Sequence, residues 1–352
     1  MTWLPPSPEE QIQFLRNIQR LLAEGLTSST YKFALLHALA DLAVLKGDDT
    51  GAPLELRTTD IASRFVELYW RQCRPFQGSR SRGGLILKQN NGRHAAIVTD
   101  IVAVQKEHGG ALSRLQQPAD GRWSQLVSHV EQIVRVMPLW KLQRLGREQL
   151  QFLYGNAQRV SAITLKPGVA YNLRAFYPLL RDVIQGAWIR FVQQLNVHEL
   201  GDIADLGTFL FAQERGSLEI YRPILRDVQH GNCLYCGEPL LTLAHVDHFI
   251  PWSRYPADLG HNLVLVHDTC NRDKSDHLGA EEHLCAWRQR NHQHDAELRD
   301  RLSEAGLPSD PSSSLMIVNL AYDQTEKAKG QVWVVKKMLR HLSAEWRDCL
   351  NT

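Results

Sequence analysis

The sequence predicts a mainly α, multi-domain protein that contains one small module of two short strands and a helix. The chain has 352 residues, which is enough for two or three domains, and 43% of them are hydrophobic. Apolar residues recur at helical spacing over much of the first 200 residues. In the second half, cysteine and histidine pairs surround two short runs whose alternation favours strands.

The N-terminal region, residues 1–205, is expected to be mostly helical. Residues 7–10 (SPEE) have the pattern of a capping box with proline at the first helical position, so a helix should run from there to about Gly25. Apolar residues on more than one side of residues 29–47 predict a second helix in a central position. Thr59-Asp60 begins a third helix, which Pro75 ends.

Further helices are expected over residues 122–145, with a break or kink at Pro138, and over residues 171–195. Several aromatic side chains of the second of these helices favour core positions over base stacking: Phe176, Tyr177, Trp188 and Phe191. Residues 160–165 predict a strand. The basic, glycine-rich residues 77–93 fit either a hairpin with basic tips that enters a nucleic-acid groove or a plain surface loop.

A second domain is predicted over residues 206–305, with a helical lead-in before the strands and a charged helix over residues 281–305 after them. The remaining residues, 306–352, are predicted to form a linker and a C-terminal amphipathic helix. The linker is assigned to the turn-rich residues 308–314 and the helix to residues 330–350.

Two cysteine and histidine pairs predict a structural zinc site. Zinc prefers four tetrahedral ligands from thiolate sulfur and imidazole nitrogen, and a two-residue spacing supplies two ligands from one tight turn. The expected ligands are Cys233, Cys236, His267 and Cys270. Cysteine is commoner than histidine at the third of these positions, so His277 and His261 stay open as alternatives to His267. A redox role is not expected, because no thioredoxin-like βαβ pattern surrounds the cysteines.

A second set of polar side chains lies between and beside these pairs. Strands are predicted over residues 244–251 and 262–266, followed by a helix from about residue 270. This order brings Asp247, His248 and Asn271 together. Carboxylate and amide oxygens suit Mg²⁺, and a neutral histidine beside them can take a proton from water.

The segment resembles the HNH (ββα-metal) endonuclease family over roughly residues 226–290. The family pattern consists of C-x-x-C, D-H-x-x-P, N-L and C-x-x-C-N-x-x-K. In this sequence the corresponding residues are Cys233 and Cys236, Asp247-His248-x-x-Pro251, Asn262-Leu263, and His267-x-x-Cys270-Asn271-x-x-Lys274. The one departure is His267, where the family usually has cysteine.

The resemblance implies a role for each matching residue. His248 would be the general base that activates water, and Asp247 and Asn271 would hold the catalytic Mg²⁺ or Mn²⁺. Asn262 would brace the loop and orient His248 through backbone contacts. Cleavage in this family leaves a 5′-phosphate and a 3′-hydroxyl.

Three more residues are candidates for substrate contact. Arg272 and Lys274 are expected either to touch phosphate or to lie on a solvated helix face. His245 is expected to be an additional metal ligand, a substrate contact or a hydrogen-bonded structural histidine.

Charge distribution agrees with a nucleic-acid substrate, for which we expect DNA. The net charge of the chain is only +2, but residues 74–147 contain twelve Lys or Arg and four Asp or Glu. Residues 1–73, by contrast, contain seven Lys or Arg and nine Asp or Glu. The local positive excess suits a phosphate-facing surface, and the alternative is a basic solvated face. The helical N-terminal region could also bind a protein partner or form a dimer.

A cytoplasmic location is expected. Cys73, Cys285 and Cys349 are scattered along the chain, which favours a reducing compartment over a disulfide framework. The N-terminus has no basic and apolar signal pattern, and no run of about 20 apolar residues is long enough to span a bilayer.

The sequence therefore predicts an HNH endonuclease that hydrolyses phosphodiester bonds in DNA and contains structural zinc and a catalytic divalent ion. A prokaryotic restriction or phage-defence role is the preferred context. Two alternatives stay open: a nuclease directed at RNA, and a zinc-stapled module that binds nucleic acid without cutting it.

Overall fold

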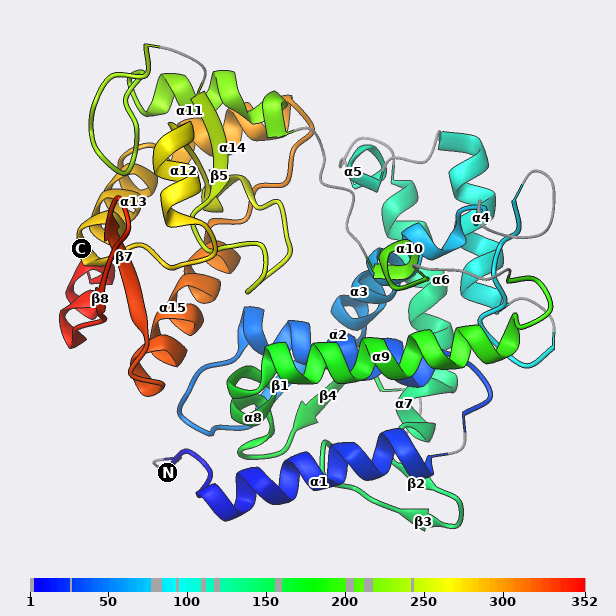
Figure 1. Cartoon of the computed structure of the whole chain (residues 1–352). Coiled ribbons are helices and arrows are strands. Elements are labelled where there is room, and N and C mark those ends of the chain that lie inside the picture. The colour runs from blue at the N-terminus through cyan, green and yellow to red at the C-terminus, as the bar shows by residue number, and fades with distance from the viewer. Residues whose placement is uncertain are drawn as a thin grey trace. The chain divides into compact units, whose positions relative to one another are not determined.

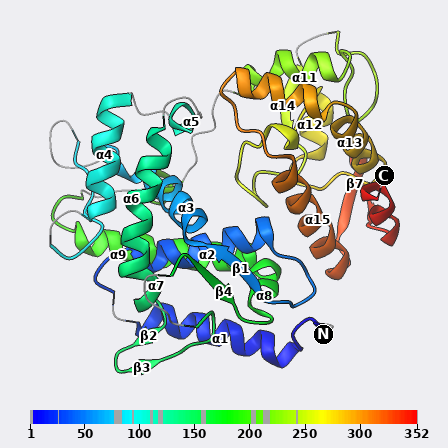
Figure 2. The same ribbon diagram turned by 180° about the vertical axis from the view of Figure 1, so that it is seen from behind.

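The computed structural model describes residues 3–25, 27–76, 84–92, 95–108, 112–116, 121–155, 160–200, 206–211, 218–241 and 244–351. The protein is mostly helical, as predicted, and divides into two compact units, Met1–Ala212 and Gln213–Thr352 (Figures 1 and 2). The predicted division into functional regions at residues 205 and 305 stays a prediction.

Unit 1 (Met1–Ala212) consists of helices and two short pairs of strands. Its described helices are α1 (Pro8–Glu24), α2 (Tyr31–Lys46), α3 (Thr58–Trp70), the 3-10 turn η1 (Arg71–Cys73), α4 (Ala96–His108), α5 (Leu112–Leu115), α6 (Arg122–Val136), α7 (Pro138–Lys141), α8 (Val169–Ala175), α9 (Tyr177–Leu195) and α10 (Leu206–Phe211). Its described strands are β1 (Leu54–Arg57), β2 (Arg144–Leu145), β3 (Glu148–Gln149) and β4 (Ala162–Leu165). The antiparallel pairs are β1–β4 and β2–β3.

Local sequence signals account for the first helices. The Ser7 backbone N–H donates to the Glu10 carboxylate at 2.7 Å and the Glu10 N–H donates to the Ser7 hydroxyl at 3.3 Å, which is the predicted capping box. Helix α2 is buried on all sides from Phe33 to Val44, so its predicted central position is confirmed. The predicted contribution of Trp188 and Tyr177 to the core is confirmed too, since both are buried.

Proline determines where two of the predicted helices stop. Helix α6 ends before Pro138, which begins α7 at its first turn, as expected. The single helix predicted over residues 171–195 is wrong, because the chain forms α8 and α9 with a break at Phe176. Pro178 lies in the first turn of α9 and lacks the N–H that would continue the preceding helix. Residues 77–83 and Arg93 of the basic segment 77–93 lie outside the described residues.

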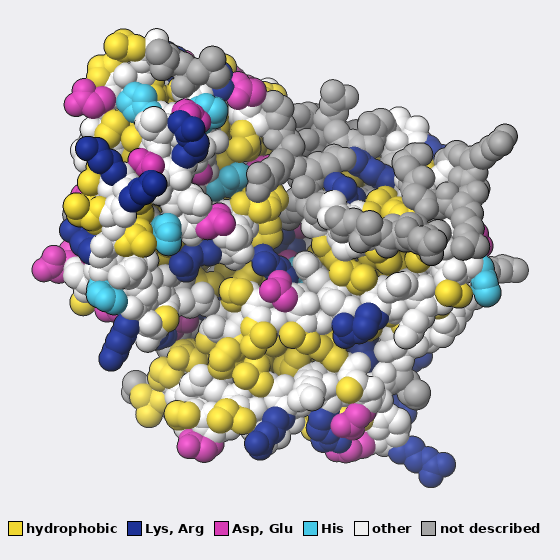
Figure 3. All heavy atoms as spheres, in the orientation of Figure 1, with side chains coloured by type: hydrophobic (Ala, Val, Ile, Leu, Met, Phe, Trp, Pro, Cys, Tyr) yellow, Lys and Arg dark blue, Asp and Glu magenta, His cyan; other side chains and the backbone are white. Residues whose placement is uncertain are grey.

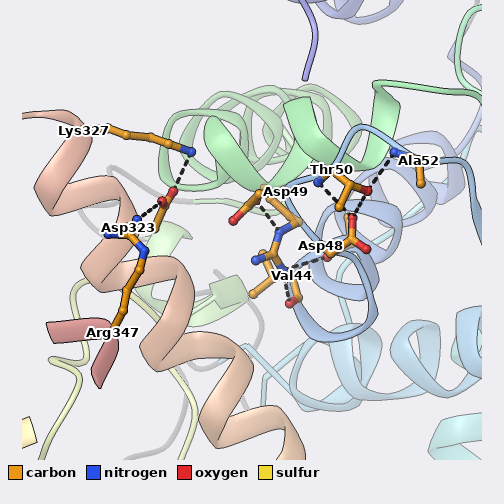
Figure 4. Close-up of polar contacts among 10 residues, drawn as sticks. Val44, Asp48, Asp49, Thr50, Ala52, Asp323, Lys327 and Arg347 are labelled. Carbon is orange, nitrogen blue, oxygen red and sulfur yellow. Dashed lines mark hydrogen bonds and ion pairs between the residues drawn. The ribbon is translucent and has the colours of Figure 1, made fainter. Parts of the chain in front are cut away.

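A buried arginine caps the C-terminal end of α2. Nη1 of Arg174 donates to the carbonyls of Ala43 and Val44 at 3.3 and 2.7 Å, and Nε pairs with Asp49 at 3.1 Å. Figure 4 shows the contacts at Val44 and Asp49. The guanidinium supplies a donor to the Val44 carbonyl and a second donor to the Ala43 carbonyl, which also accepts from the Gly47 N–H, and it interacts favourably with the helix dipole.

Unit 2 (Gln213–Thr352) contains the predicted strand and zinc segment. Its described helical elements are η3 (Leu218–Tyr221), α11 (Arg222–Val228), η4 (Gly260–Asn262), α12 (Asp268–Lys274), α13 (Glu281–Gln293), α14 (Asp295–Glu304), α15 (Pro311–Lys327) and η5 (Ala344–Leu350). Its described strands are β5 (Ala244–His248), β6 (Leu263–His267), β7 (Gln331–Val335) and β8 (Met338–His341), which form the antiparallel pairs β5–β6 and β7–β8.

The elements expected around the site occur in the expected order. Strands β5 and β6 pair with Asp247 opposite Val264 and His248 opposite Leu263, and α12 follows β6 directly. Figure 1 shows α12 beside β5, and α12 contacts both strands. The helix predicted over residues 281–305 is instead two helices, α13 and α14, with a break at His294.

The predictions for residues 306–352 are wrong. Asp310 caps α15 by accepting from the Ser313 N–H at 2.8 Å, so the Asp, Pro and Ser residues taken for a linker begin a helix. The C-terminal helix predicted over residues 330–350 is the β7–β8 hairpin followed by η5. Val332, Val334 and Val335 are β-branched and favour a strand, which outweighs the helix-like spacing of the apolar residues.

The C-terminal segment is attached to unit 2 by polar contacts and a disulfide. Asp323 on α15 pairs with Lys327 at 2.6 Å and with Arg347 on η5 at 3.4 Å (Figure 4). Cys285 on α13 and Cys349 on η5 form a disulfide. The expectation that these scattered cysteines form no disulfide is therefore wrong, because the chain folds back and brings together two residues 64 positions apart.

The described part of the chain contains no helix with the length and apolar character needed to cross a bilayer. The cytoplasmic location stays a prediction. On the face shown in Figure 3, basic, acidic and histidine side chains lie interspersed on the exposed surface.

Replacing Arg174 with methionine tests the cap on α2. We expect Arg174→Met to reduce the opening free energy of the α2 amides by about 2–3 kcal/mol, because buried carbonyls lose a charged donor. Native-state hydrogen exchange measures this change. Arg190 is exposed on α9, so Arg190→Met should change it by less than about 0.5 kcal/mol. Equal effects of the two substitutions would contradict the capping role.

Candidate functional site

Four side chains from two distant segments form a cluster suited to zinc. Their ligand atoms all lie within 4.8 Å of one another, and the residues are Cys233, Cys236, His267 and Cys270. Three thiols and one imidazole are a usual donor set for a tetrahedral structural zinc. The alternative ligands are not in the cluster: His277 is exposed outside it, and His261 is buried and lies 3.3 Å from Asp295.

Backbone geometry delivers the two pairs of ligands. The Cys233 N–H donates to the Glu238 carbonyl and the Gly237 N–H donates to the Cys233 carbonyl, both at 2.9 Å, which closes a tight turn. Gly237 has φ +74°, a value that glycine adopts without steric cost. The second pair lies where β6 ends and α12 begins.

Burial and mutual repulsion favour the protonated form of the cluster thiols while no cation is bound. Burial and the neighbouring Cys233 and Cys236 raise the pKa of Cys270 to about 12, and burial raises the pKa of Cys236. Thiolates this close repel one another unless a metal ion neutralises them, so metal binding would release their protons. Nδ1 of His267 lies 3.3 Å from the Cys236 sulfur, and its Nε2 lies 3.3 Å from the Pro239 carbonyl, a second contact that can fix the ring.

His248 lies at the end of β5 on the buried side of the strand and is 7% exposed. Its Nε2 is 2.8 Å from Oδ1 of Asp258, in the loop between β5 and η4. The ring also packs edge-on against Trp252, with centroids 5.1 Å apart. The carboxylate holds the imidazole in one orientation and favours the tautomer that carries its proton on Nε2, which leaves Nδ1 as a proton acceptor.

Asn262 binds the loop that follows His248. Its side-chain oxygen accepts from the Ile250 N–H at 2.9 Å and its side-chain nitrogen donates to the Ile250 carbonyl at 3.1 Å. The Asn262 carbonyl accepts from the Phe249 N–H at 2.8 Å. These three bonds are backbone contacts of the kind expected for Asn262, and they fix the chain directly after His248.

The preceding carbonyl, that of His261, is held from the other side by α13. It accepts from Trp287 Nε1 at 2.9 Å, from Asn291 Nδ2 at 3.0 Å and from Arg290 Nη2 at 3.2 Å. Three donors on one carbonyl fix the turn that carries Asn262.

Asp247 lies on the half-exposed side of β5. Its Oδ2 accepts from the Tyr235 hydroxyl at 2.7 Å and lies 3.0 Å from Nζ of Lys274. Burial and the nearby Asp247 carboxylate raise the pKa of Tyr235 well above 10, so its hydroxyl is protonated and donates. Among the described residues, no hydrogen bond reaches the other oxygen, Oδ1.

The predicted phosphate contact of Lys274 does not agree with its position. Its side chain is 0% exposed, and Nζ also donates to the His248 carbonyl at 3.1 Å. Lys274 therefore stabilises β5 through its contacts with Asp247 and with the His248 carbonyl. Arg272 is 70% exposed at its side chain and pairs with Asp268 at 2.7 Å, so it can reach solvent.

Asn271 and His245 have different surroundings. Asn271 is half-buried on α12, three residues before Lys274 and therefore on the same helix side, and no described residue hydrogen-bonds to its amide. His245 shares the half-exposed side of β5 with Asp247, opposite to His248, and lies 3.5 Å from Asp268.

Two residues at the site were not among the sequence predictions. Asp258 contacts His248 and Tyr235 contacts Asp247, although neither belongs to a catalytic pattern. The position of Tyr235 between two cysteines of the cluster was the available signal for it. The only signal for Asp258 was its place as an acidic residue in the loop between two predicted strands.

Comparison with known families supports the resemblance seen in the motifs. Residues 233–277 match the family described as HNH endonuclease. The match is shorter than the expected 226–290 and contains the four cluster residues together with Asp247, His248, Asn262 and Asn271. No curated protein and no solved structure matches the chain.

Changing His267 tests the assignment of the fourth zinc ligand. We expect about one zinc per chain in the wild type and in His267→Cys, which restores a four-cysteine site, but well below one in His267→Ala. Zinc content is measured by plasma mass spectrometry after gel filtration. His277→Ala is the control and should keep its zinc. Full zinc content in His267→Ala would contradict the assignment.

Proposed function

We propose that this chain, whose residues 233–277 form an HNH endonuclease domain, is a metal-dependent endonuclease that hydrolyses phosphodiester bonds in DNA. The observation that carries the proposal is the placement of His248 and Asp247 at neighbouring positions of β5, beside the cysteine and histidine cluster and against α12. A proton acceptor and a carboxylate thus occupy adjacent positions of one strand, on its two sides, within the segment that matches a nuclease family.

The residues proposed to hold the catalytic divalent ion fit that task. Oδ1 of Asp247 and the side-chain amide of Asn271 take part in no hydrogen bond with the described residues. Carboxylate and amide oxygens suit Mg²⁺ or Mn²⁺ as ligands. Lys274 opposes the charge of a cation, but its Nζ lies on the Oδ2 side of the carboxylate. When bound, the ion would neutralise charge on the scissile phosphate and on the leaving oxygen.

His248 then acts as the general base. Its Nδ1 takes a proton from the attacking water while Asp258 accepts the hydrogen bond from Nε2 and stabilises the charge that develops on the ring. Asn262 keeps the backbone after His248 in place during this step. Arg272 is positioned on the exposed side of α12 to contact phosphate.

The helical unit 1 is proposed to recognise the substrate or a protein partner. The excess of Lys and Arg over residues 74–147 supports contact with nucleic acid. A role in prokaryotic restriction or phage defence, in the cytoplasm, is the context that we propose for such an enzyme.

Cleavage of supercoiled plasmid DNA tests the proposed activity. Wild type should nick it with Mg²⁺ or Mn²⁺ and not with EDTA, and His248→Ala should be slower by about 10²–10⁴-fold because the general base is lost. Nicking is followed on agarose gels, and zinc content is measured on the same samples. His292→Ala removes an exposed histidine on α13 and should cut like the wild type.

Other outcomes of this assay would contradict parts of the proposal. Cleavage of a matched RNA but not of DNA would replace the substrate class. Equal rates for wild type and His248→Ala would exclude His248 as the base. Binding of DNA without cleavage would point to a zinc-stapled binding module.

Replacing Asp258 tests the role of the carboxylate that contacts His248. We expect Asp258→Ala to lower kcat by about 10–100-fold, a part of what a general base contributes, while zinc content stays unchanged. Asp300→Ala removes an exposed carboxylate on α14 and serves as the control. Wild-type kcat in Asp258→Ala would exclude a role for this pair in the reaction.

A further inference from the structure

The hydroxyl of Tyr235 joins the zinc turn to the side chain proposed to bind the catalytic ion. Tyr235 lies between Cys233 and Cys236, so its backbone belongs to the turn that supplies two zinc ligands. The same side chain reaches Asp247 on β5 and donates to Oδ2 at 2.7 Å. One residue therefore belongs to the turn of the cysteine and histidine cluster and also contacts the carboxylate of Asp247.

The ring of Tyr235 is held rigidly. It is buried and packs edge-on against His283 and Trp333, with centroids 5.4 and 5.3 Å apart. His283 in turn bonds to the Val334 carbonyl at 2.7 Å, and Trp333 N–H bonds to the Leu278 carbonyl at 2.7 Å. Because the ring cannot move freely, the hydroxyl holds a fixed position relative to β5.

Two donors then converge on the same oxygen of Asp247. Nζ of Lys274 and the Tyr235 hydroxyl both contact Oδ2, at 3.0 and 2.7 Å. A carboxylate held by two donors on one oxygen cannot rotate about its terminal bond without losing both contacts. Its other oxygen, Oδ1, is thereby kept in one direction.

Tyr235 and Lys274 differ in what they do to a cation. The ammonium of Lys274 repels a divalent ion, while the neutral hydroxyl orients the carboxylate without adding charge. Hydrogen-bonding partners of this kind behind a metal ligand fix its orientation, and their loss typically costs about 10–100-fold in metal affinity.

We propose that Tyr235 is a positioning residue that orients Asp247 toward the catalytic divalent ion and so couples that site to the zinc turn. The inference rests on the proposed function, because it takes Asp247 as a ligand of the ion. The inference adds Tyr235 to the residues of the proposed catalytic site, although it is not a metal ligand. The zinc turn would then orient Asp247 as well as stabilise the fold.

Binding of Mn²⁺ alone to the full-length, zinc-loaded protein tests the proposal. Tyr235→Phe keeps the ring and removes only the hydroxyl. We expect its dissociation constant for Mn²⁺, measured from the electron paramagnetic resonance signal of free Mn²⁺, to rise by about tenfold or more with zinc content unchanged. Tyr322→Phe is the matched control, since Tyr322 is buried in the same unit and donates to the Gly279 carbonyl at 2.6 Å, not to Asp247.

A rescue variant and the metal dependence of cleavage complete the test. With p-aminophenylalanine at position 235, which keeps a donor on the ring, Mn²⁺ affinity should return to within about threefold of the wild type. In cleavage assays, Tyr235→Phe should need about tenfold more Mn²⁺ for half-maximal rate and retain kcat at saturating metal.

The outcomes separate this proposal from the proposed function. Wild-type Mn²⁺ affinity in Tyr235→Phe together with lost affinity in Asp247→Ala would overturn the positioning role and leave the nuclease proposal intact. Wild-type affinity in Asp247→Ala would overturn both, because Asp247 would not be a ligand. Loss of zinc from Tyr235→Phe would also overturn the positioning role, since the hydroxyl would then serve the zinc turn itself.

Discussion

The site depends on the cluster of Cys233, Cys236, His267 and Cys270, which joins a tight turn to the junction of β6 and α12. The two-stranded sheet β5–β6 is short and could not hold several side chains in a fixed geometry by its backbone bonds alone. A metal ion bound in the cluster would tie together the turn, the end of β6 and the start of α12. The contacts of Tyr235 and Lys274 with Asp247 start from the turn and from α12.

From this cluster, two sets of contacts reach β5. Tyr235 extends from the turn to Asp247, and Lys274 extends from the end of α12 to Asp247 and to the His248 carbonyl. The other side of the site is fixed independently of the metal. There, three donors of α13 bind the His261 carbonyl. The next residue, Asn262, hydrogen-bonds to Ile250 in the loop after His248. Asp247 is thus held from the turn and from α12, and the loop after His248 is held by Asn262.

The sequence was sufficient for the parts of the site that depend on short spacings. Two cysteines three positions apart can supply two metal ligands from one turn, and the alternation around Asp247 and His248 placed them on a strand correctly. Contacts that depend on tertiary packing could not be foreseen. Asp258 reaches His248 only through the conformation of its loop, and Lys274 is buried because its side of α12 packs on β5.

The C-terminal segment shows the same limit in the fold. Apolar residues over 330–350 fit a helical spacing and a strand pair about equally well, and the turn residues before them fit both a linker and a helix cap. The Cys285–Cys349 disulfide also depends on the way in which η5 folds back on α13, which no cysteine spacing indicates. Local patterns therefore identified the functional segment better than they identified its supporting elements.

The central claim is that one small domain holds structural zinc and, beside His248, a catalytic ion. The most direct test is a crystal structure of the zinc-loaded protein soaked in Mn²⁺, with anomalous data collected at the zinc and manganese absorption edges. We predict a zinc peak inside the cysteine and histidine cluster and a separate manganese peak between Asp247 and Asn271. A zinc peak with no manganese at Asp247 would contradict the account.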